Sequence, residues 1–199
     1  SGNVNSNWEV VASNADGSRL IAGYFSDTGY ATWYLTGRLY MSSNYGATWT
    51  EVQPAGNTEN PWQTASFSSD GSHIIVGAWG RPSHASYVPG NGRLWLSSNY
   101  GATWTETRPA GDFDTTWRTT SSSSDGSYLL AANESSSGHV YISSNYGATW
   151  TEANFADLGR YSYTSASSAD GNHLIVGNSP GRLYMYHGAS CVNGSCIGP

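Results

Sequence analysis

The carboxylates are the side chains of this sequence that could catalyse a reaction. Four of the fourteen Asp and Glu residues lie in Asp-Gly pairs and three follow Trp-Thr, so seven stand outside these repeats. Two carboxyl groups about 5–10 Å apart across a cleft can hydrolyse a glycosidic bond, and Asp112 with Asp114, or Glu59 with Asp112, could form such a pair. For Asp112-Phe113-Asp114 we favour a turn or an incidental cation site, and for the chain a non-enzymatic role. The seven carboxylates are Glu9, Asp27, Glu59, Asp112, Asp114, Glu134 and Asp157.

Aromatic residues beside Asn, Asp and Arg indicate a second chemistry, which is sugar binding. Flat rings stack on the C–H faces of a pyranose, and planar polar groups bind its hydroxyls. The alternative is that these rings cap a core or fill long loops. The candidate ligand-binding residues are Tyr24, Trp33, Tyr34, Glu59, Trp79, Arg81, His84, Asp112, Asp114 and Arg160.

The histidines do not form a recognisable metal or catalytic motif in the sequence. His73 and His173 occupy equivalent positions of a repeat, where Arg19 and Tyr128 stand in the other copies. Such interchange argues against a metal-binding or catalytic role. The sequence also has no evident Ser/His/Asp motif or phosphate loop, so we expect no cofactor and no metal.

An eight-residue stretch, Ser-Ser-Asn-Tyr-Gly-Ala-Thr-Trp, occurs three times and dominates the organisation of the chain. The copies cover residues 42–49, 97–104 and 143–150, each after a short β-rich run and before Thr-Glu. Asn-Tyr-Gly tolerates positive φ, which predicts a tight hairpin. We expect the Ser and Thr hydroxyls to satisfy backbone groups and the Trp to pack back over the turn.

A second repeated element, Asp-Gly followed by an apolar run, precedes each hairpin and occurs four times. It predicts a turn and then a buried central strand. An aromatic residue opens each unit, at Trp8, Trp62, Trp117 and Tyr161, and this spacing is typical of propeller blades. We expect these four side chains to pack between blades.

The repeated hairpin closely resembles the Asp-box, Ser-x-Asp-x-Gly-x-x-Trp, of the sialidase-type (BNR) β-propeller family, with Asn44, Asn99 and Asn145 in place of the Asp. Asn makes the same local bonds, so the fold inference survives the replacement. The resemblance implies a structural hairpin on the outer part of each blade, away from the active face. Sialidases of this family use an arginine triad, a Tyr/Glu pair and an Asp on six blades. This chain has too few units and mostly repeat-borne arginines, so we do not expect sialidase activity.

The expected fold is all-β: a small β-propeller of about four antiparallel blades, with the box hairpins between strands C and D. It covers residues 1–188, with units starting near residues 8, 62, 117 and 161. The fourth blade is incomplete, since it reaches strand C at residues 181–185 and then lacks its own strand D. A four-bladed ring is the simplest arrangement, with a strand supplied by the tail or a piece of a longer chain as alternatives. The unfinished edge also favours self-association through the fourth blade, with two chains forming a larger ring.

Loop lengths distinguish two faces of this propeller. The A–B turns and C–D hairpins at one end of the strands are short and uniform, whereas the B–C and D–A loops at the other end vary in length and content. Variation on a rigid scaffold is typical of a binding surface. The candidate ligand-binding residues lie in or beside these variable loops, so we expect the ligand on the variable loop face.

The composition of the chain argues against some classes of binding partner. The 199 residues carry a net charge of −6, with eight Arg and no Lys, so nucleic acid and anionic membranes are not expected partners. No apolar run reaches the ~20 residues that span a bilayer. Cys191 and Cys196 lie in a Gly/Ser-rich tail, residues 189–199, and predict a small disulfide loop. This pair favours a secreted, extracellular protein.

We therefore expect a secreted, lectin-like propeller that binds an oligosaccharide or polysaccharide on the variable loop face. A protein-interaction or assembly propeller module is the first alternative. The second is a small glycoside- or polysaccharide-degrading domain that uses loop carboxylates.

Overall fold

The computed structural model describes residues 7–27, 35–80, 92–134, 138–153, 161–179 and 181–187. These residues form strands and turns, with no helix among them. The described part of the chain accordingly contains no helix long and apolar enough to cross a membrane.

Four antiparallel sheets follow one another along the chain, and each is a blade of neighbouring strands. The first blade contains β1 (Asn7–Ser13), β2 (Leu20–Asp27), β4 (Leu39–Ser42) and β5 (Thr50–Val52), with the short β3 (Leu35–Thr36) paired to the end of β2. The second contains β6 (Trp62–Phe67), β7 (Ile74–Ala78), β8 (Leu94–Ser97) and β9 (Thr105–Thr107). The third contains β10 (Thr116–Ser122), β11 (Leu129–Glu134), β12 (His139–Ser143) and β13 (Thr151–Ala153). The fourth has three strands within the described residues, β14 (Tyr161–Ser167), β15 (His173–Ser179) and β16 (Leu183–His187). The predicted all-β fold, a small propeller of four antiparallel blades, is confirmed.

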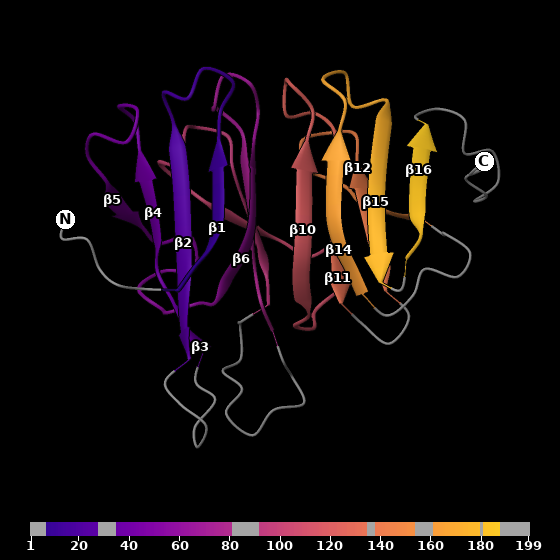
Figure 1. The fold of residues 1–199 in the computed structure, drawn as a ribbon, viewed down its shortest axis with the longest axis horizontal. Helices are drawn as coiled ribbons and strands as arrows, with labels where there is room; N and C mark the ends of the chain where they lie inside the picture. Colours follow the sequence, from indigo (N-terminus) through magenta and orange to yellow (C-terminus); the bar gives the residue numbers. More distant parts are fainter. Residues whose placement is uncertain are drawn as a thin grey trace.

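The blades pack face to face in chain order. β1 packs against β6, β6 against β10 and β10 against β14, while β1 and β14 have no comparable packing between their described residues. Figure 1 shows the first and fourth sheets at opposite ends of this row. An apolar core fills each junction because alternate side chains of a strand point to opposite faces of its sheet. The three cores include Ile21, Leu39 and Trp62, then Ile75, Leu94 and Trp117, then Leu130, Val140 and Leu174.

The three repeated hairpins form where the sequence predicts them. Their central tyrosines have φ angles between 57° and 61°. In the first hairpin Ser42 Oγ accepts the Gly46 N–H at 2.9 Å, and Asn44 Oδ1 accepts the Thr48 N–H at 2.9 Å. The same bonds recur in the other two copies. The asparagine therefore supplies the side-chain oxygen that organises the turn.

One of the four opening aromatic residues differs from the expected packing, and the Tyr161 side chain lies outside what the structure describes. Trp62 and Trp117 are buried between blades as predicted, but Trp8 is exposed, because the described residues form no blade before the first one to cover it. In the fourth blade Ser162 pairs with Asn178, the residue after Gly177, just as Trp62 pairs with Ala78, the residue after Gly77. Tyr161 therefore lies one residue before the equivalent position.

Candidate functional site

One arginine, Arg93, lies just before β8 and contacts three acidic side chains at the variable loop face. Arg93 forms ion pairs with Asp114 and, at 3.4 Å, with Asp112, and its guanidinium lies 3.6 Å from Glu106. Arg108 extends the cluster, with Nη1 2.5 Å from Asp112 and Nε 2.8 Å from Glu106. The hydrogen bond to Glu106 raises the pKa of Arg108. The structure thus brings Asp112 and Asp114, both predicted site residues, together around one arginine.

The equivalent arginine of the first blade holds Glu59. Arg38 contacts Glu51 at 3.1 Å, Asn57 at 3.1 Å and Glu59 at 3.5 Å. Glu59 therefore binds the arginine of the first blade and Asp112 that of the second. In both clusters an arginine and its polar neighbours hold the carboxylates in place at the loop end of a blade.

Trp79 lies at the loop end of the junction between the second and third blades. The Arg118 guanidinium lies over its ring, 5.5 Å from the centroid, and forms an ion pair with Glu134. The Trp79 backbone N–H donates to the Pro61 carbonyl at 2.8 Å. The half-buried indole is thus fixed at this junction, with a cation over its ring.

Tyr24 lies on the face of the first blade that points away from the second blade. Its ring packs edge-on against Trp8, with 5.5 Å between centroids, and stacks on Tyr40 at 6.3 Å. Burial raises the pKa of Tyr24. The remaining predicted residues, namely Trp33, Tyr34, Arg81, His84, Arg160, Cys191 and Cys196, lie outside the described residues.

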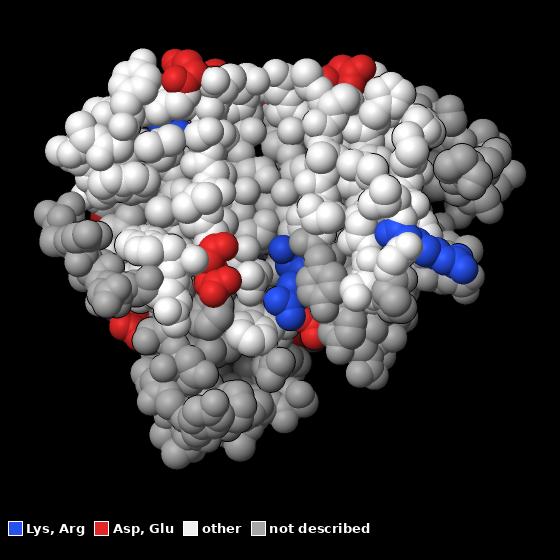
Figure 2. Space-filling view, in the orientation of Figure 1, with Lys and Arg blue, Asp and Glu red and all other residues white. Residues whose placement is uncertain are grey.

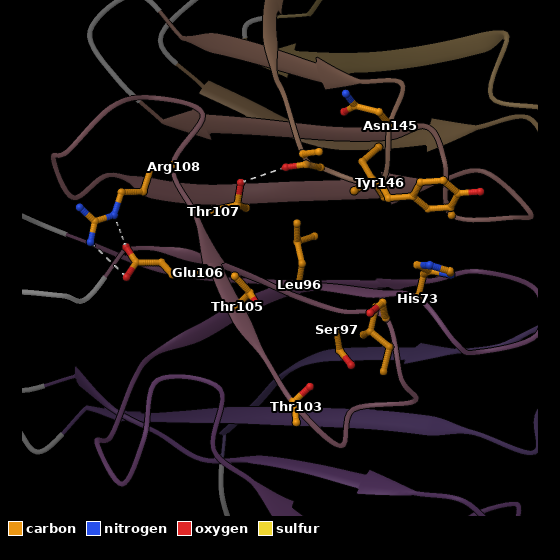
Figure 3. Close-up of a pocket in the computed structure, with 16 residues that line it drawn as sticks. His73, Leu96, Ser97, Thr103, Thr105, Glu106, Thr107, Arg108, Asn145 and Tyr146 are labelled. Atoms are coloured by element: carbon orange, nitrogen blue, oxygen red, sulfur yellow. Dashed lines mark hydrogen bonds and ion pairs between the residues drawn. The ribbon is translucent and has the colours of Figure 1, made fainter.

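A groove of about 640 Å³ runs along β9, between the second and third blades. Figure 3 shows Arg108 with Glu106 at one end of it and Tyr146 with His73 at the other. Between the two ends the lining is mixed. It includes the polar side chains of Thr103, Thr105, Thr107 and Asn145 and the apolar side chains of Leu96 and Leu129.

Strand alternation and hairpin geometry place these side chains. Thr105 and Thr107 lie on one face of β9 because side chains alternate along a strand. Thr107 Oγ1 accepts the Trp150 indole N–H at 2.8 Å, which ties β9 to the third hairpin. In that hairpin Tyr146 has a φ of 58°, and its ring lies 4.8 Å from the His73 ring. The groove therefore forms where the second and third blades meet.

The sequence does not predict the groove, because its repeated hairpin motif indicates an architectural role. Arg108 lines it and also binds Asp112, so the groove and the predicted loop-face cluster share a residue. One sequence signal was present. At the position of Thr107, β5 has Val52 and β13 has Ala153, so among the three blades whose last strand is described only the second has a hydroxyl there.

The described residues contain no group of three or more His, Cys, Asp or Glu side chains that could hold a metal ion. Figure 2 shows isolated acidic and basic groups on the visible face, without a broad patch of either sign. The arrangement thus offers hydroxyl, amide, guanidinium and aromatic groups, which can bind a polar ligand of low charge.

Comparison with known proteins identifies the fold and no family. No protein-family model and no curated protein matches the sequence. Among solved structures, an ancestral GH74 enzyme is similar over 91% of the chain, with a TM-score of 0.67 and 16% identity. The GH74 xyloglucanase from Xanthomonas campestris is similar over 91%, with a TM-score of 0.59 and 19% identity. YCF48 bound to D1 peptide is similar over 94%, with a TM-score of 0.58 and 12% identity.

The chain spans only part of each of these proteins. It covers 25% of the ancestral enzyme, 30% of the xyloglucanase and 53% of YCF48. At these identities the likeness shows the fold alone. The neighbours are β-propeller proteins, and this chain shares their fold.

Proposed function

We propose that this chain is a secreted, lectin-like β-propeller module of the Asp-box type that binds carbohydrate. Its site extends from the loop-face cluster around Arg93 into the groove along β9. The observation that carries the proposal is the groove itself, because its hydroxyl, amide and aromatic lining ends at the arginine that binds Asp112. Its volume of about 640 Å³ lies within the roughly 300–1,000 Å³ typical of small-ligand sites.

Tyr146 lines one end of the groove, and Phe113 follows Asp112, whose carboxylate binds Arg108 at the other end. Phe113 is 63% exposed beside Asp112, and Tyr146 is 49% exposed at the far end of the groove. A ring of this kind can stack on the C–H face of a sugar, while the groups between the rings bind hydroxyls. Two separated rings suit an extended chain of sugar units better than a single one.

Two further observations support parts of the proposal. Two of the structural neighbours are GH74 enzymes, and one of them is named a xyloglucanase. The three hairpins keep the serine and asparagine hydrogen bonds expected of the Asp-box. The tail cysteines are the reason to propose secretion.

The test is a binding screen against a broad glycan and polysaccharide panel, followed by titration of intrinsic fluorescence with any ligand found. Tyr146→Ala and Phe113→Ala should each weaken binding about three- to tenfold, because one ring contact contributes about 0.5–1.5 kcal/mol. Tyr45→Ala is the matched control, since it changes the same hairpin position, with the same positive φ, outside the groove. An equal loss in Tyr45→Ala, or no saturable ligand on the panel, would contradict the proposal.

A protein-binding or assembly role is the second candidate. YCF48, one of the structural neighbours, is described with a bound peptide. Within the described residues β9 is an edge strand of its sheet, and an edge strand can pair with an extended segment of another chain. Such binding would use backbone groups of β9 and should survive both Tyr146→Ala and Phe113→Ala.

Turnover of a bound glycan would favour the third candidate, a polysaccharide-degrading domain. The measurement is release of new reducing ends during long incubation with the ligand. Asp112→Asn, at an exposed position, should abolish that release and keep binding if Asp112 is catalytic. Binding without release supports the lectin-like role.

A further inference from the structure

Every blade junction is built in the same way. We call the face of a blade toward the following blade its front face and the opposite one its back face. Two front-face positions are at most 1% exposed in each of the first three blades. They are Ile21 and Leu39 in the first blade, Ile75 and Leu94 in the second, and Leu130 and Val140 in the third.

The fourth blade carries a front face that no described residue covers. Its β16 places Leu183 at the position of Leu39, and this side chain is 70% exposed. Met185, at the position of the buried Met41, is exposed as well. The apolar residue types of a junction are therefore present here, and residues 7–187 as far as they are described supply no partner blade for them.

The first blade carries the complementary back face, which no part of the described chain covers either. Trp8 is 44% exposed, whereas Trp62 at the same position of the second blade is 2% exposed. Val11 is 76% exposed, although its counterpart Thr120 in the third blade is buried. The two ends of the row thus expose the two different halves of one kind of junction.

A series of backbone hydrogen bonds crosses the junctions and stops at the same two ends. The Ala15 N–H donates to the Ser69 carbonyl at 3.1 Å, Ser69 donates to Ser124 at 2.7 Å, and Ser124 donates to Ala169 at 2.7 Å. Within the described residues the series continues neither beyond Ala169 nor before Ala15. Ala169 is left with the donor and Ala15 with the acceptor of a fourth bond.

The glycines of the Asp-Gly turns indicate independently which blades meet a preceding blade. A Cβ at the Asp-Gly glycine of the second, third or fourth blade would clash with a side chain of the preceding blade, whereas Gly17 of the first blade has nothing within 4 Å. In the fourth blade the position of Arg19, His73 and Tyr128 is occupied by His173, whose ring contacts His187. The observed contacts are Gly71 with Arg19, Gly126 with His73 and Gly171 with Tyr128.

The hairpin glycines repeat this pattern. A Cβ at Gly101 would lie 2.5 Å from Met41 of the preceding blade, and one at Gly147 would clash with Leu96. Gly46, in the first blade, meets only atoms of its own blade.

We propose that a second copy of this chain packs head to tail on these ends, with the front face of its fourth blade against the back face of the first blade. The Ala169 N–H of one copy then donates to the Ala15 carbonyl of the other. His173 meets Gly17, and Met185 meets Gly46. Leu183 is covered by Trp8, as Leu39 is by Trp62.

A second copy is the occupant because a front face accepts a back face at every junction, and the chain exposes one of each. The contact joins unlike surfaces, so it is heterologous and closes only as a ring. Two copies supply eight blades, within the roughly four to eight that propellers use. This association packs whole sheet faces and differs from the edge-strand pairing expected from the sequence.

The experiment is the mass of the full chain in solution, by light scattering after size exclusion at about 100 μM. The expected result is twice the chain mass of 21.2 kDa. Leu183→Glu, on the front face, and Val11→Lys, on the back face, should each give the mass of one chain. Both positions are exposed in the single chain, so circular dichroism and thermal unfolding should confirm that the variants fold. Phe113→Glu, another exposed apolar position away from both faces, is the matched control and should keep the double mass.

Mixing the two variants tests the head-to-tail geometry. Each retains one intact face, and the two intact faces are complementary, so the mixture should again give a species of two chains. A like-with-like contact would instead survive in one of the single variants, which would contradict the proposal. A single-chain mass for the unmodified protein would overturn it and leave a blade of another protein as the occupant. A ladder of larger masses would contradict closure into a two-copy ring.

Discussion

Asp70 shows how one side chain fixes a blade turn. Its Oδ1 accepts hydrogen bonds from Ser68 Oγ at 2.7 Å, from the Ser72 N–H at 2.9 Å and from Ser72 Oγ at 2.8 Å. These bonds lower the pKa of Asp70 to about 2, and similar bonds lower that of Asp170 to about 2. Because each folded-state pKa lies below the unfolded value, the stability it contributes is complete above about pH 4 and is lost as the pH falls toward 2.

We expect the free energy of unfolding to decrease between pH 4 and pH 2, and Asp70→Asn to reduce that decrease. Asn keeps the acceptor oxygen, as Asn44 does in the first hairpin, but it has no carboxylate to protonate. Urea unfolding at pH 7, 4, 3 and 2 measures the effect. An acid dependence identical in the variant and the unmodified chain would show that this turn does not contribute to it.

The hairpin tryptophans differ in one hydrogen bond. Trp150 donates to Thr107 of the preceding blade at 2.8 Å, whereas the buried Trp104 indole N–H has no acceptor among the described residues. The residue at the position of Thr107 in the first blade is Val52, and it packs against the same core as Trp104. The Trp104 N–H therefore lacks an acceptor because residue 52 is a valine, where the second blade has Thr107.

The two residues can be exchanged in opposite directions. Thr107→Val should destabilise the fold by about 1–3 kcal/mol, because it leaves a buried N–H unpaired. Val52→Thr should stabilise it by about 0.5–1.5 kcal/mol, because it supplies an acceptor to Trp104. Denaturant unfolding measures both, and each variant controls for the general effect of a Val/Thr exchange. Changes of the same sign would rule out the hydrogen bond as their cause.

At the scale of the strands, hydroxyl groups join the innermost strands of neighbouring blades. Thr64 Oγ1 on β6 accepts the Thr120 N–H of β10 at 2.8 Å, and the two hydroxyls are 2.9 Å apart. Both threonines are buried. Junctions are thus held by directional bonds as well as by apolar packing.

Thr64→Val should cost about 1–3 kcal/mol, because the Thr120 N–H loses its acceptor in a buried place. Thr164→Val is the matched control. It occupies the same register position of the fourth blade, is exposed there, and should change stability by less than about 0.5 kcal/mol at low protein concentration. Thermal and urea unfolding provide the comparison. Equal costs at the two positions would contradict a role for the interblade bond.

The strands and hairpins were predictable where local residues decide the backbone. Asn-Tyr-Gly and Asp-Gly fix φ and supply their own hydrogen bonds, so these turns form as the sequence predicts. The register position of Trp62 is occupied by Ser162 in the fourth blade, next to the aromatic Tyr161, because register follows the pairing of β14 with β15 rather than residue type. The groove could not be predicted, because Thr107 and Tyr146 lie on different blades and meet only in the packed junction.

At the scale of the whole molecule, counting repeats gives the number of blades but not how the row ends. A ring of four would require β14 to pack against β1, and the described residues show no such packing. The angle between blades comes from side chains that meet across a junction, such as Trp62 at Gly23, and this information is absent from the repeat pattern.

A two-copy ring would carry two equal grooves, so a polysaccharide long enough to reach both would bind with higher apparent affinity than a short oligosaccharide.

Association also predicts how heat stability depends on protein concentration. A chain that unfolds from a two-copy ring gains stability by mass action, so the unmodified protein should show a Tm that rises by about 2 °C for each tenfold increase in concentration. Leu183→Glu removes the front-face contact while the side chain it replaces is already 70% exposed in the single chain, so its Tm should be independent of concentration. Differential scanning calorimetry from about 5 to 500 μM measures both slopes. A concentration-independent Tm in the unmodified chain, or parallel slopes in the two proteins, would mean that the exposed ends of the row do not bind each other.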